Sequence, residues 1–119
     1  MASVLLVEDE SEIRSMLCDM LIDDGHHVIE ADCGDTAARI IDQAPDIDIL
    51  VTDVRMPGHL NGLALGQHFH KSYSCSPILY FTGSPETLNH VPMRHGVEIV
   101  LSKPSGLLAL AATVRTLLS

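Results

Sequence analysis

Three consecutive acidic residues follow the first apolar run of the chain. The run Val4–Val7 is typical of a buried strand, and Glu8, Asp9 and Glu10 come directly after it. Carboxylates ~4 Å apart at an effective dielectric constant of about 20 repel by about 4 kcal/mol per pair. A hard cation such as Mg²⁺ offsets this repulsion, because it takes a few carboxylates and keeps sites for water and phosphate oxygens. The alternative is that acids after a strand face solvent or favour a helix start, and we prefer it for Glu10.

Three further polar side chains stand at the ends of later apolar runs. Asp53 follows the third run, Thr82 ends the fourth, and Lys103 follows the fifth. Because the carboxyl ends of parallel strands meet at one edge of a sheet, these side chains and the first acids should converge there. We therefore expect Asp9 and Asp53 to be direct Mg²⁺ ligands, with Glu8 acting through water.

The elements that position these side chains follow from the spacing of apolar residues. Five short apolar runs, continuous and rich in β-branched residues, predict strands buried on both faces and hence a parallel sheet. They are Val4–Val7, His27–Ala31, Ile47–Thr52, Pro77–Thr82 and Val97–Ser102. Helical spacing or helix-start signals mark Ile13–Leu21, Thr36–Gln43, Leu63–Lys71, a segment opening at Ser84-Pro85-Glu86, and Leu107–Leu118. The order predicts an α/β fold, with a doubly wound five-stranded parallel sheet and five helices on its two faces.

Length and charge narrow the class of protein. The chain has 119 residues, which fits a single domain spanning residues 1–119. It carries 16 Asp and Glu against 7 Lys and Arg, a net charge of −9, which disfavours nucleic acid and anionic membranes as partners. The three cysteines predict neither a disulfide framework nor a zinc site. A basic leader and an apolar run of about 18 residues are both missing, so we expect a cytoplasmic protein.

Four sequence motifs carry a resemblance to a known family. The motifs LLVEDE, VTDVRMPG with a following NG, FTGS and LSKP resemble those of the receiver domain of two-component response regulators. They occur in the family's order and cover essentially the whole chain. The family fold is the (βα)₅, flavodoxin-like arrangement, in agreement with the fold predicted from apolar spacing. The resemblance implies a bacterial signal-transduction phosphoprotein of the kind found in phosphorelays.

The resemblance also implies a role for each acid. Asp53 would be the phosphoacceptor, taking a phosphoryl group from a histidine kinase or a histidine phosphotransfer protein. The cofactor would be Mg²⁺, held by Asp9, Asp53 and the backbone carbonyl of Arg55, with Glu8 assisting. The protein would not be an enzyme beyond catalysing its own phosphorylation and dephosphorylation.

Two further roles concern charge on the phosphoryl group. The resemblance implies that Thr82 hydrogen-bonds the attached group and that Lys103 pairs with it as a point charge. It also implies a cis peptide bond before Pro104. A carboxylate nucleophile forms an acyl phosphate through a loose transition state that spreads charge over equatorial oxygens. Mg²⁺, Thr82 and Lys103 are suited to stabilise that charge.

Several positions depart from the family pattern. Val100 stands three residues before Lys103, where many receivers carry a switching Tyr or Phe, so the readout should be reduced or different. Pro92 falls inside the predicted fourth helix, which it should kink or end. A downstream protein partner is expected on the face formed by the fourth helix, fifth strand and fifth helix. The last helix is nearly uncharged and predicts either an apolar docking face or an ordinary helix edge, with three residues off its core stripe: Leu108, Ala112 and Leu118.

Other functions fit the residues less well. A flavin-binding module would need a Gly- or Ser-rich phosphate loop where Glu8, Asp9 and Glu10 stand. A phosphatase with an Asp-x-Asp motif would need an acid at position 55, which is Arg55. The main alternative is a pseudo-receiver, an unphosphorylated scaffold for protein interactions, which usually lacks one of the acids, the Thr or the Lys.

Overall fold

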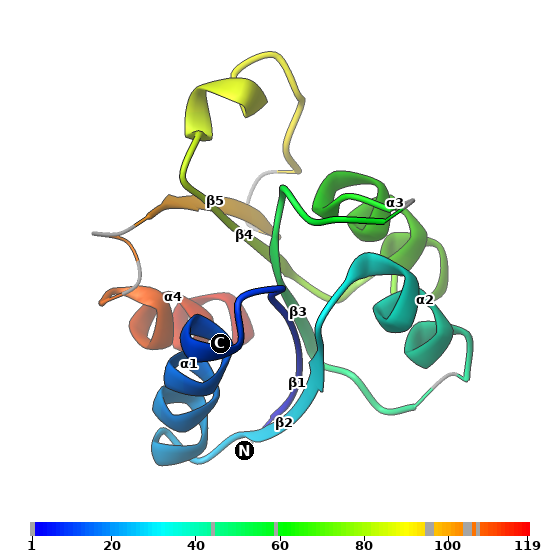
Figure 1. Cartoon of the computed structure of the whole chain (residues 1–119). Helices are drawn as coiled ribbons and strands as arrows, with labels where there is room; N and C mark the ends of the chain where they lie inside the picture. The colour runs from blue at the N-terminus through cyan, green and yellow to red at the C-terminus, as the bar shows by residue number, and fades with distance from the viewer. Residues whose placement is uncertain (1, 44, 59, 95–96, 104–105, 107) are drawn as a thin grey trace.

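A five-stranded parallel sheet runs through the middle of the computed structural model of the chain (Figure 1). The structure describes residues 2–43, 45–58, 60–94, 97–103, 106 and 108–119. The strands are β1 (Ser3–Val7), β2 (His27–Ala31), β3 (Ile49–Asp53), β4 (Ile78–Thr82) and β5 (Glu98–Ser102). Their order in the sheet is β2-β1-β3-β4-β5, and every neighbouring pair is parallel. This doubly wound topology confirms the predicted fold class.

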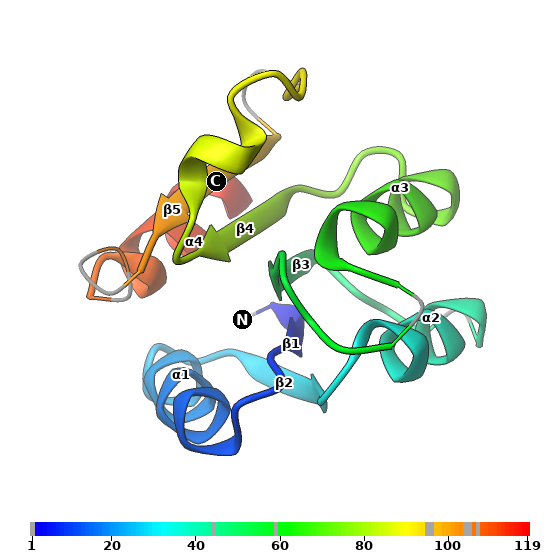
Figure 2. The same ribbon diagram turned by 45° about the horizontal axis from the view of Figure 1, so that its top comes forward.

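Helices cover both faces of the sheet. Within the described residues the α-helices are α1 (Ser11–Asp23), α2 (Gly34–Asp42), α3 (Gly62–Ser72) and α4 (Leu110–Leu118). Helices α1 and α4 lie on one face and α2 and α3 on the other, as the two views show (Figures 1 and 2). No helix in the described part of the chain is both long and apolar enough to cross a membrane.

Two apolar clusters hold the helices against the sheet. One joins β1, β3 and β4 to α2 and α3, and includes Leu65, Phe69 and Tyr80. The other joins the opposite face of the same strands to α1 and α4, and includes Leu17 and Phe81. All five residues of β3 and of β4 are buried, as expected for central strands covered on both sides.

The predicted fourth α-helix is wrong. The signal at Ser84-Pro85-Glu86 does begin a helix, but it is a single 3-10 turn, η1 (Pro85–Leu88), which lies near β5. The Leu88 carbonyl accepts the Val91 N–H at 3.0 Å. An α-helix would require residue 92 to donate to that carbonyl, and Pro92 has no N–H. The last helix is also shorter than predicted, and its expected first residue, Leu107, lies outside the described residues.

The expected exposure of the last helix is only partly correct. Leu108 is 87% exposed and Ala112 is exposed, as predicted. Leu118 is half-buried and packs against the apolar cluster beside α1, so its placement off the core stripe was wrong. The apolar surface at this end of the molecule is therefore smaller than the sequence predicts.

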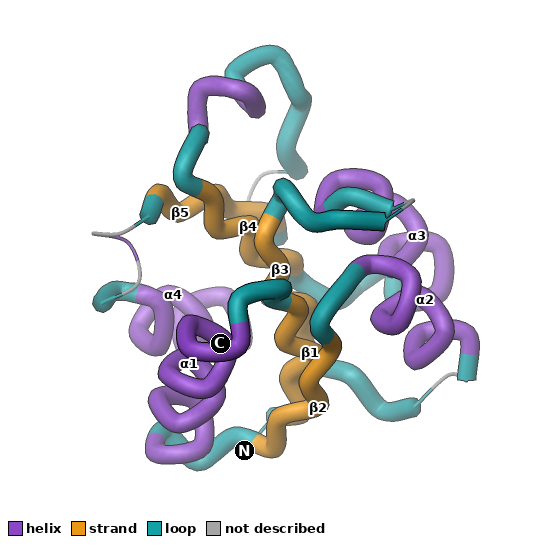
Figure 3. The backbone as a smooth tube through the Cα atoms, viewed as in Figure 1, coloured by secondary structure: helices purple, strands orange, loops and turns teal. Residues whose placement is uncertain are grey.

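The register of the strands brings the predicted site residues to one edge. Val7 pairs with Thr52, so Glu8 and Asp53 follow at the same level on neighbouring strands. On β4 and β5, Thr82 pairs with Ser102. Thr82 and Lys103, which follows Ser102, therefore lie at the same edge. The loops that continue from these strand ends are teal in Figure 3.

A close approach between α3 and β4 gives a first prediction. A Cβ at Gly66 would overlap the Tyr80 hydroxyl and lie 2.8 Å from ring atom Cζ. Gly→Ala inside a helix normally stabilises by about 0.5–1 kcal/mol, but here overpacking should make Gly66→Ala destabilising by about 1–3 kcal/mol. Urea denaturation of the parent and the variant measures this difference in the free energy of unfolding.

The matched control is Gly83→Ala, because a Cβ at Gly83 would meet no atom within 4 Å. Its stability should stay within about 0.5 kcal/mol of the parent. Adding Tyr80→Phe to Gly66→Ala should recover part of the loss. A stabilising effect of Gly66→Ala alone would contradict the packing argument.

Candidate functional site

A half-buried lysine joins two of the predicted acids. The Lys103 ammonium donates to Glu8 Oε1 at 2.8 Å and to Asp53 Oδ2 at 2.9 Å. The side chain of Glu8 is 0% exposed, that of Asp53 8% and that of Lys103 15%. The ammonium also lies 5.0 Å from the centre of the Phe81 ring, within cation–π range. The prediction that side chains from β1, β3 and β5 converge at this edge is thus confirmed by their contacts.

The Asp53 carboxylate is held by its own strand end. Its Oδ1 accepts the backbone N–H of Val54 at 2.7 Å, while the Thr52 hydroxyl donates to the Asp53 carbonyl at 2.8 Å. The Val54 carbonyl in turn accepts the N–H of Gly62 at the start of α3. A Cβ at Gly62 would overlap the Asp53 carbonyl, so glycine lets α3 begin directly against the strand end. These contacts fix the direction of the Asp53 side chain.

Glu8 is the most deeply buried acid of the cluster. Its Oε2 accepts the backbone N–H of Glu10 at 3.0 Å, and its Oε1 accepts the Lys103 ammonium. Burial raises the pKa of Glu8 above its ordinary value, against the lowering effects of the Glu10 N–H and of Lys103, and nearby Asp9 raises it further. Removal of Lys103 should therefore penalise the ionised form of this acid strongly.

Lys103 keeps its charge despite its burial. Burial alone would lower the pKa of the ammonium, but the hydrogen bonds and charges of Glu8 and Asp53 outweigh it and raise the pKa. The backbone N–H of Lys103 donates to the Thr82 carbonyl at 2.8 Å, which anchors the end of β5 to β4. The expected cis bond before Pro104 lies outside the described residues.

The other predicted site residues differ in how far they are exposed to solvent. Thr82 is 1% exposed, and its hydroxyl oxygen accepts the N–H of Ser84 at 3.1 Å. Asp9 is exposed, as is Arg55, which follows the phosphoacceptor candidate by two residues. The metal-binding role of the Arg55 carbonyl stays a prediction.

The acids are close enough to share a cation. Carboxylate oxygens of Glu8, Asp9 and Asp53 all lie within 4.8 Å of one another. An all-oxygen set with an exposed member fits a hard cation such as Mg²⁺ better than a soft metal. The donor set therefore fits the metal that the sequence predicts.

Sequence reasoning missed one cation of this region. The Arg14 guanidinium on α1 donates from Nη1 to the Glu8 carbonyl at 2.8 Å, and its Nε lies 3.4 Å from Glu30 Oε1. The contact joins a side chain to a backbone oxygen six residues earlier. A pattern of side-chain types carries no signal for such a contact.

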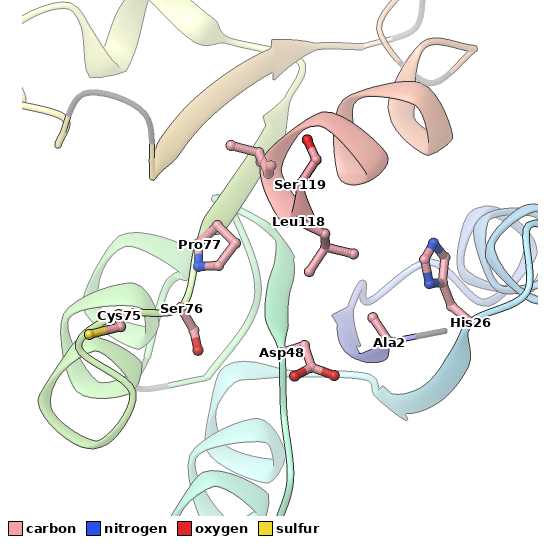
Figure 4. Close-up of a pocket in the computed structure, with 9 residues that line it drawn as sticks. Ala2, His26, Asp48, Cys75, Ser76, Pro77, Leu118 and Ser119 are labelled. Atoms are coloured by element: carbon pink, nitrogen blue, oxygen red, sulfur yellow. The ribbon is translucent and has the colours of Figure 1, made fainter.

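One cavity of the described structure lies away from the acids. It has a volume of about 600 Å³ and is lined by Ala2, His26, Asp48, Leu118 and neighbouring residues (Figure 4). These residues lie at the starts of β1, β2 and β3 and at the end of α4, at the edge of the sheet opposite the acids. None of the predicted site residues lines this cavity.

The chain matches the family model of the response regulator receiver domain over residues 4–115. It belongs to that family. A probable transcriptional regulatory protein of Picosynechococcus sp. is 33% identical over 124 residues, which cover 98% of this chain and 49% of that protein. The chain thus spans about half the length of this curated relative.

Solved structures show the same fold. The receiver domain of the hybrid histidine kinase CckA is 30% identical, with a TM-score of 0.82 over 98% of this chain and 99% of that one. A response regulator receiver protein of Sinorhizobium medicae is 27% identical, with a TM-score of 0.86 over 98% of this chain and 94% of that one. The family and fold inferred from the motifs are confirmed.

The buried cluster predicts a pH-dependent stability defect in Lys103→Met. Without the ammonium, the pKa of Glu8 should rise further above its ordinary 4.5. An acid whose folded-state pKa is raised contributes stability below its unfolded-state pKa, and this stability is lost as pH rises through the folded-state pKa. The deficit relative to the parent should therefore be small near about pH 5 and grow to about 3 kcal/mol near about pH 8.

Guanidinium unfolding at both pH values measures the deficit. Lys71→Met is the control, because Lys71 is an exposed lysine in the last turn of α3. Its stability should follow the parent at both pH values. A Lys103→Met deficit of equal size at both values would show that burial of Glu8 is not its cause.

Proposed function

We propose that this chain is a phosphoacceptor module in which Asp53 takes a phosphoryl group from a histidine kinase or a histidine phosphotransfer protein. The observation that carries the proposal is the contact of Lys103 with both Asp53 and Glu8 at the carboxyl edge of the sheet. This edge lies at the switch point between β1 and β3, where such folds bind their ligands. Family membership supports the same function.

Asp53 is suited to act as the nucleophile. Its Oδ1 is fixed by the Val54 N–H, and its Oδ2 is held by Lys103. In the proposed step, a carboxylate oxygen forms a bond to phosphorus while the bond from phosphorus to the donor nitrogen breaks. The imidazole of the donor leaves with the electron pair, and Asp53 becomes an acyl phosphate. Because these contacts already orient the carboxylate, the reaction loses less orientational entropy than it would with a free carboxylate.

Mg²⁺ is the proposed cofactor. Asp9 and Asp53 would hold it with the Arg55 carbonyl, and Glu8 would assist while engaged by Lys103 and the Glu10 N–H. Bound Mg²⁺ supplies positive charge that offsets the acids and the phosphoryl oxygens. The closeness of the three carboxylates supports this assignment.

Lys103 and Thr82 complete the proposed site. The ammonium lies beside Asp53 and can follow the negative charge when it moves from the carboxylate to the phosphoryl oxygens. The Thr82 hydroxyl accepts the Ser84 N–H, which leaves its own hydrogen for a phosphoryl oxygen. Both groups lie where they can stabilise the negative charge of the loose transition state.

A downstream protein partner would recognise the phosphorylated form. The proposed face is formed by η1, β5 and α4, where Ile99 and Leu108 expose apolar side chains. A cytoplasmic location and a lack of nucleic-acid or membrane contact remain predictions from composition. So does the absence of enzyme activity beyond the chain's own phosphorylation and dephosphorylation.

The pseudo-receiver scaffold is the alternative function. It would use the same fold for protein binding without transfer of a phosphoryl group. The chain retains Glu8, Asp9, Asp53, Thr82 and Lys103, which a scaffold does not need. This retention favours the phosphoacceptor function.

A phosphorylation assay tests the proposal. We expect the parent chain to gain the mass of one phosphoryl group when incubated with acetyl phosphate and Mg²⁺, and to gain none without Mg²⁺. Asp53→Asn should gain none in either condition, because an amide is a far weaker nucleophile than a carboxylate. Intact-protein mass spectrometry measures all samples.

Asp32→Asn is the matched control, because Asp32 is an exposed acid just after β2 at the same edge of the sheet. It should be phosphorylated like the parent. If neither acetyl phosphate nor a phosphorylated histidine phosphotransfer protein modifies the folded parent, the scaffold function replaces the proposal. Phosphorylation of Asp53→Asn would show that another residue is the phosphoacceptor.

A further inference from the structure

Arg14 spans the acidic loop between β1 and α1. Its backbone N–H donates to the Glu10 carbonyl at 2.9 Å, and its Nη1 donates to the Glu8 carbonyl at 2.8 Å. The first of these is the ordinary i→i−4 bond at the start of α1, so only the bond to the Glu8 carbonyl, on the N-terminal side of Asp9, depends on the guanidinium. The Arg14 side chain is only 20% exposed, so these contacts are partly shielded from water.

The guanidinium is itself held in place. Its Nε faces Glu30 on β2, with 3.4 Å between Nε and Oε1. The next residue on β2, Ala31, accepts the Glu8 N–H at 3.1 Å. The Glu8 backbone is therefore bound on its N–H side by β2 and on its carbonyl side by Arg14.

Asp9 is the exposed member of the acid cluster. Its carboxylate lies beside that of Glu8 and raises the pKa of Glu8. Repulsion from Glu8 favours movement of Asp9 away from the cluster. The position of its carboxylate depends on the backbone of residues 8–10, which Arg14 binds.

We propose that Arg14 is a positioning residue that holds the Glu8–Glu10 backbone so that Asp9 faces Asp53 and Mg²⁺ can bind. This inference rests on the proposed function. Arg14 does not touch the metal or the phosphoryl group. Its guanidinium is engaged by the Glu8 carbonyl and by Glu30, which fits a role in orientation rather than in binding a phosphodonor.

Positioning and electrostatics predict opposite effects of its removal. Arg14 is a cation beside the acidic loop, so loss of its charge alone should strengthen the attraction of the site for Mg²⁺. Loss of its hydrogen bond to the Glu8 carbonyl should instead weaken Mg²⁺ binding, because Asp9 would no longer be held in place. The sign of the change in affinity therefore distinguishes the two roles.

The experiment is a titration of the ¹⁵N-labelled chain with MgCl₂, followed by the amide signals of Asp9 and Glu10. The chain has no tryptophan to report binding by fluorescence. Arg14→Met, which keeps much of the aliphatic stem, should weaken Mg²⁺ binding by about tenfold or more, as expected for one charge-assisted hydrogen bond. Without Mg²⁺, the Glu10 amide should exchange its hydrogen faster than in the parent.

Two further variants complete the test. Arg14→Lys retains the charge but cannot contact the Glu8 carbonyl and Glu30 with one rigid fork, so its affinity should be intermediate. It also provides the test if Arg14→Met does not fold. Arg39→Ala removes an exposed cation on α2 whose guanidinium contacts the Thr36 hydroxyl at 3.3 Å, and it should bind Mg²⁺ at least as tightly as the parent.

The outcomes separate this proposal from the proposed function. If the parent binds Mg²⁺ and Arg14→Met binds it equally well or more tightly, the positioning role is wrong and the phosphoacceptor function stands. If the folded parent binds no Mg²⁺, the proposed metal site fails and the role of Arg14 fails with it.

Discussion

The contact of one half-buried ammonium with two buried carboxylates is the constraint on which the rest of the site depends. Glu8 and Asp53 follow neighbouring strands, so the sheet itself forces them together. Two carboxylates this close and this buried would repel and resist ionisation. Lys103 offsets both effects, and it can do so only because β5 ends on β4 at the right level. The site therefore needs β1, β3, β4 and β5 in register.

The strands of the sheet that carries this contact differ in how deeply they are buried. Every residue of β3 and β4 is buried, whereas every residue of β5 is at least partly exposed. Beyond β4 the chain continues in the short η1 rather than in a full helix. Elements with few buried contacts open at lower free-energy cost than a packed core. A change of charge at Asp53 is therefore expected to move Lys103 and the β5 side of the molecule before it moves β3.

Sequence spacing predicted the parts of the structure that obey simple periods. Continuous apolar runs gave the strands, and topology then placed Asp53 and Lys103 at one edge. The fourth helix was predicted wrongly because its start signal is strong while Pro92 removes the donor needed to continue it. The contact between Arg14 and the Glu8 carbonyl could not be predicted, because the backbone accepts hydrogen bonds whatever the residue type.

The structure shows which residues surround Val100, the position that departs from the family pattern. Val100 pairs in register with Tyr80 on β4, and both face the apolar cluster beneath α3. The Tyr80 ring is buried, its hydroxyl lies against Gly66, and burial raises its pKa to about 12, so the phenol stays neutral. An aromatic ring thus occupies this face two residues before Thr82, although it comes from β4 rather than β5. The close fit of the Tyr80 hydroxyl at Gly66 leaves this ring little room to move, whereas every residue of β5 is at least partly exposed.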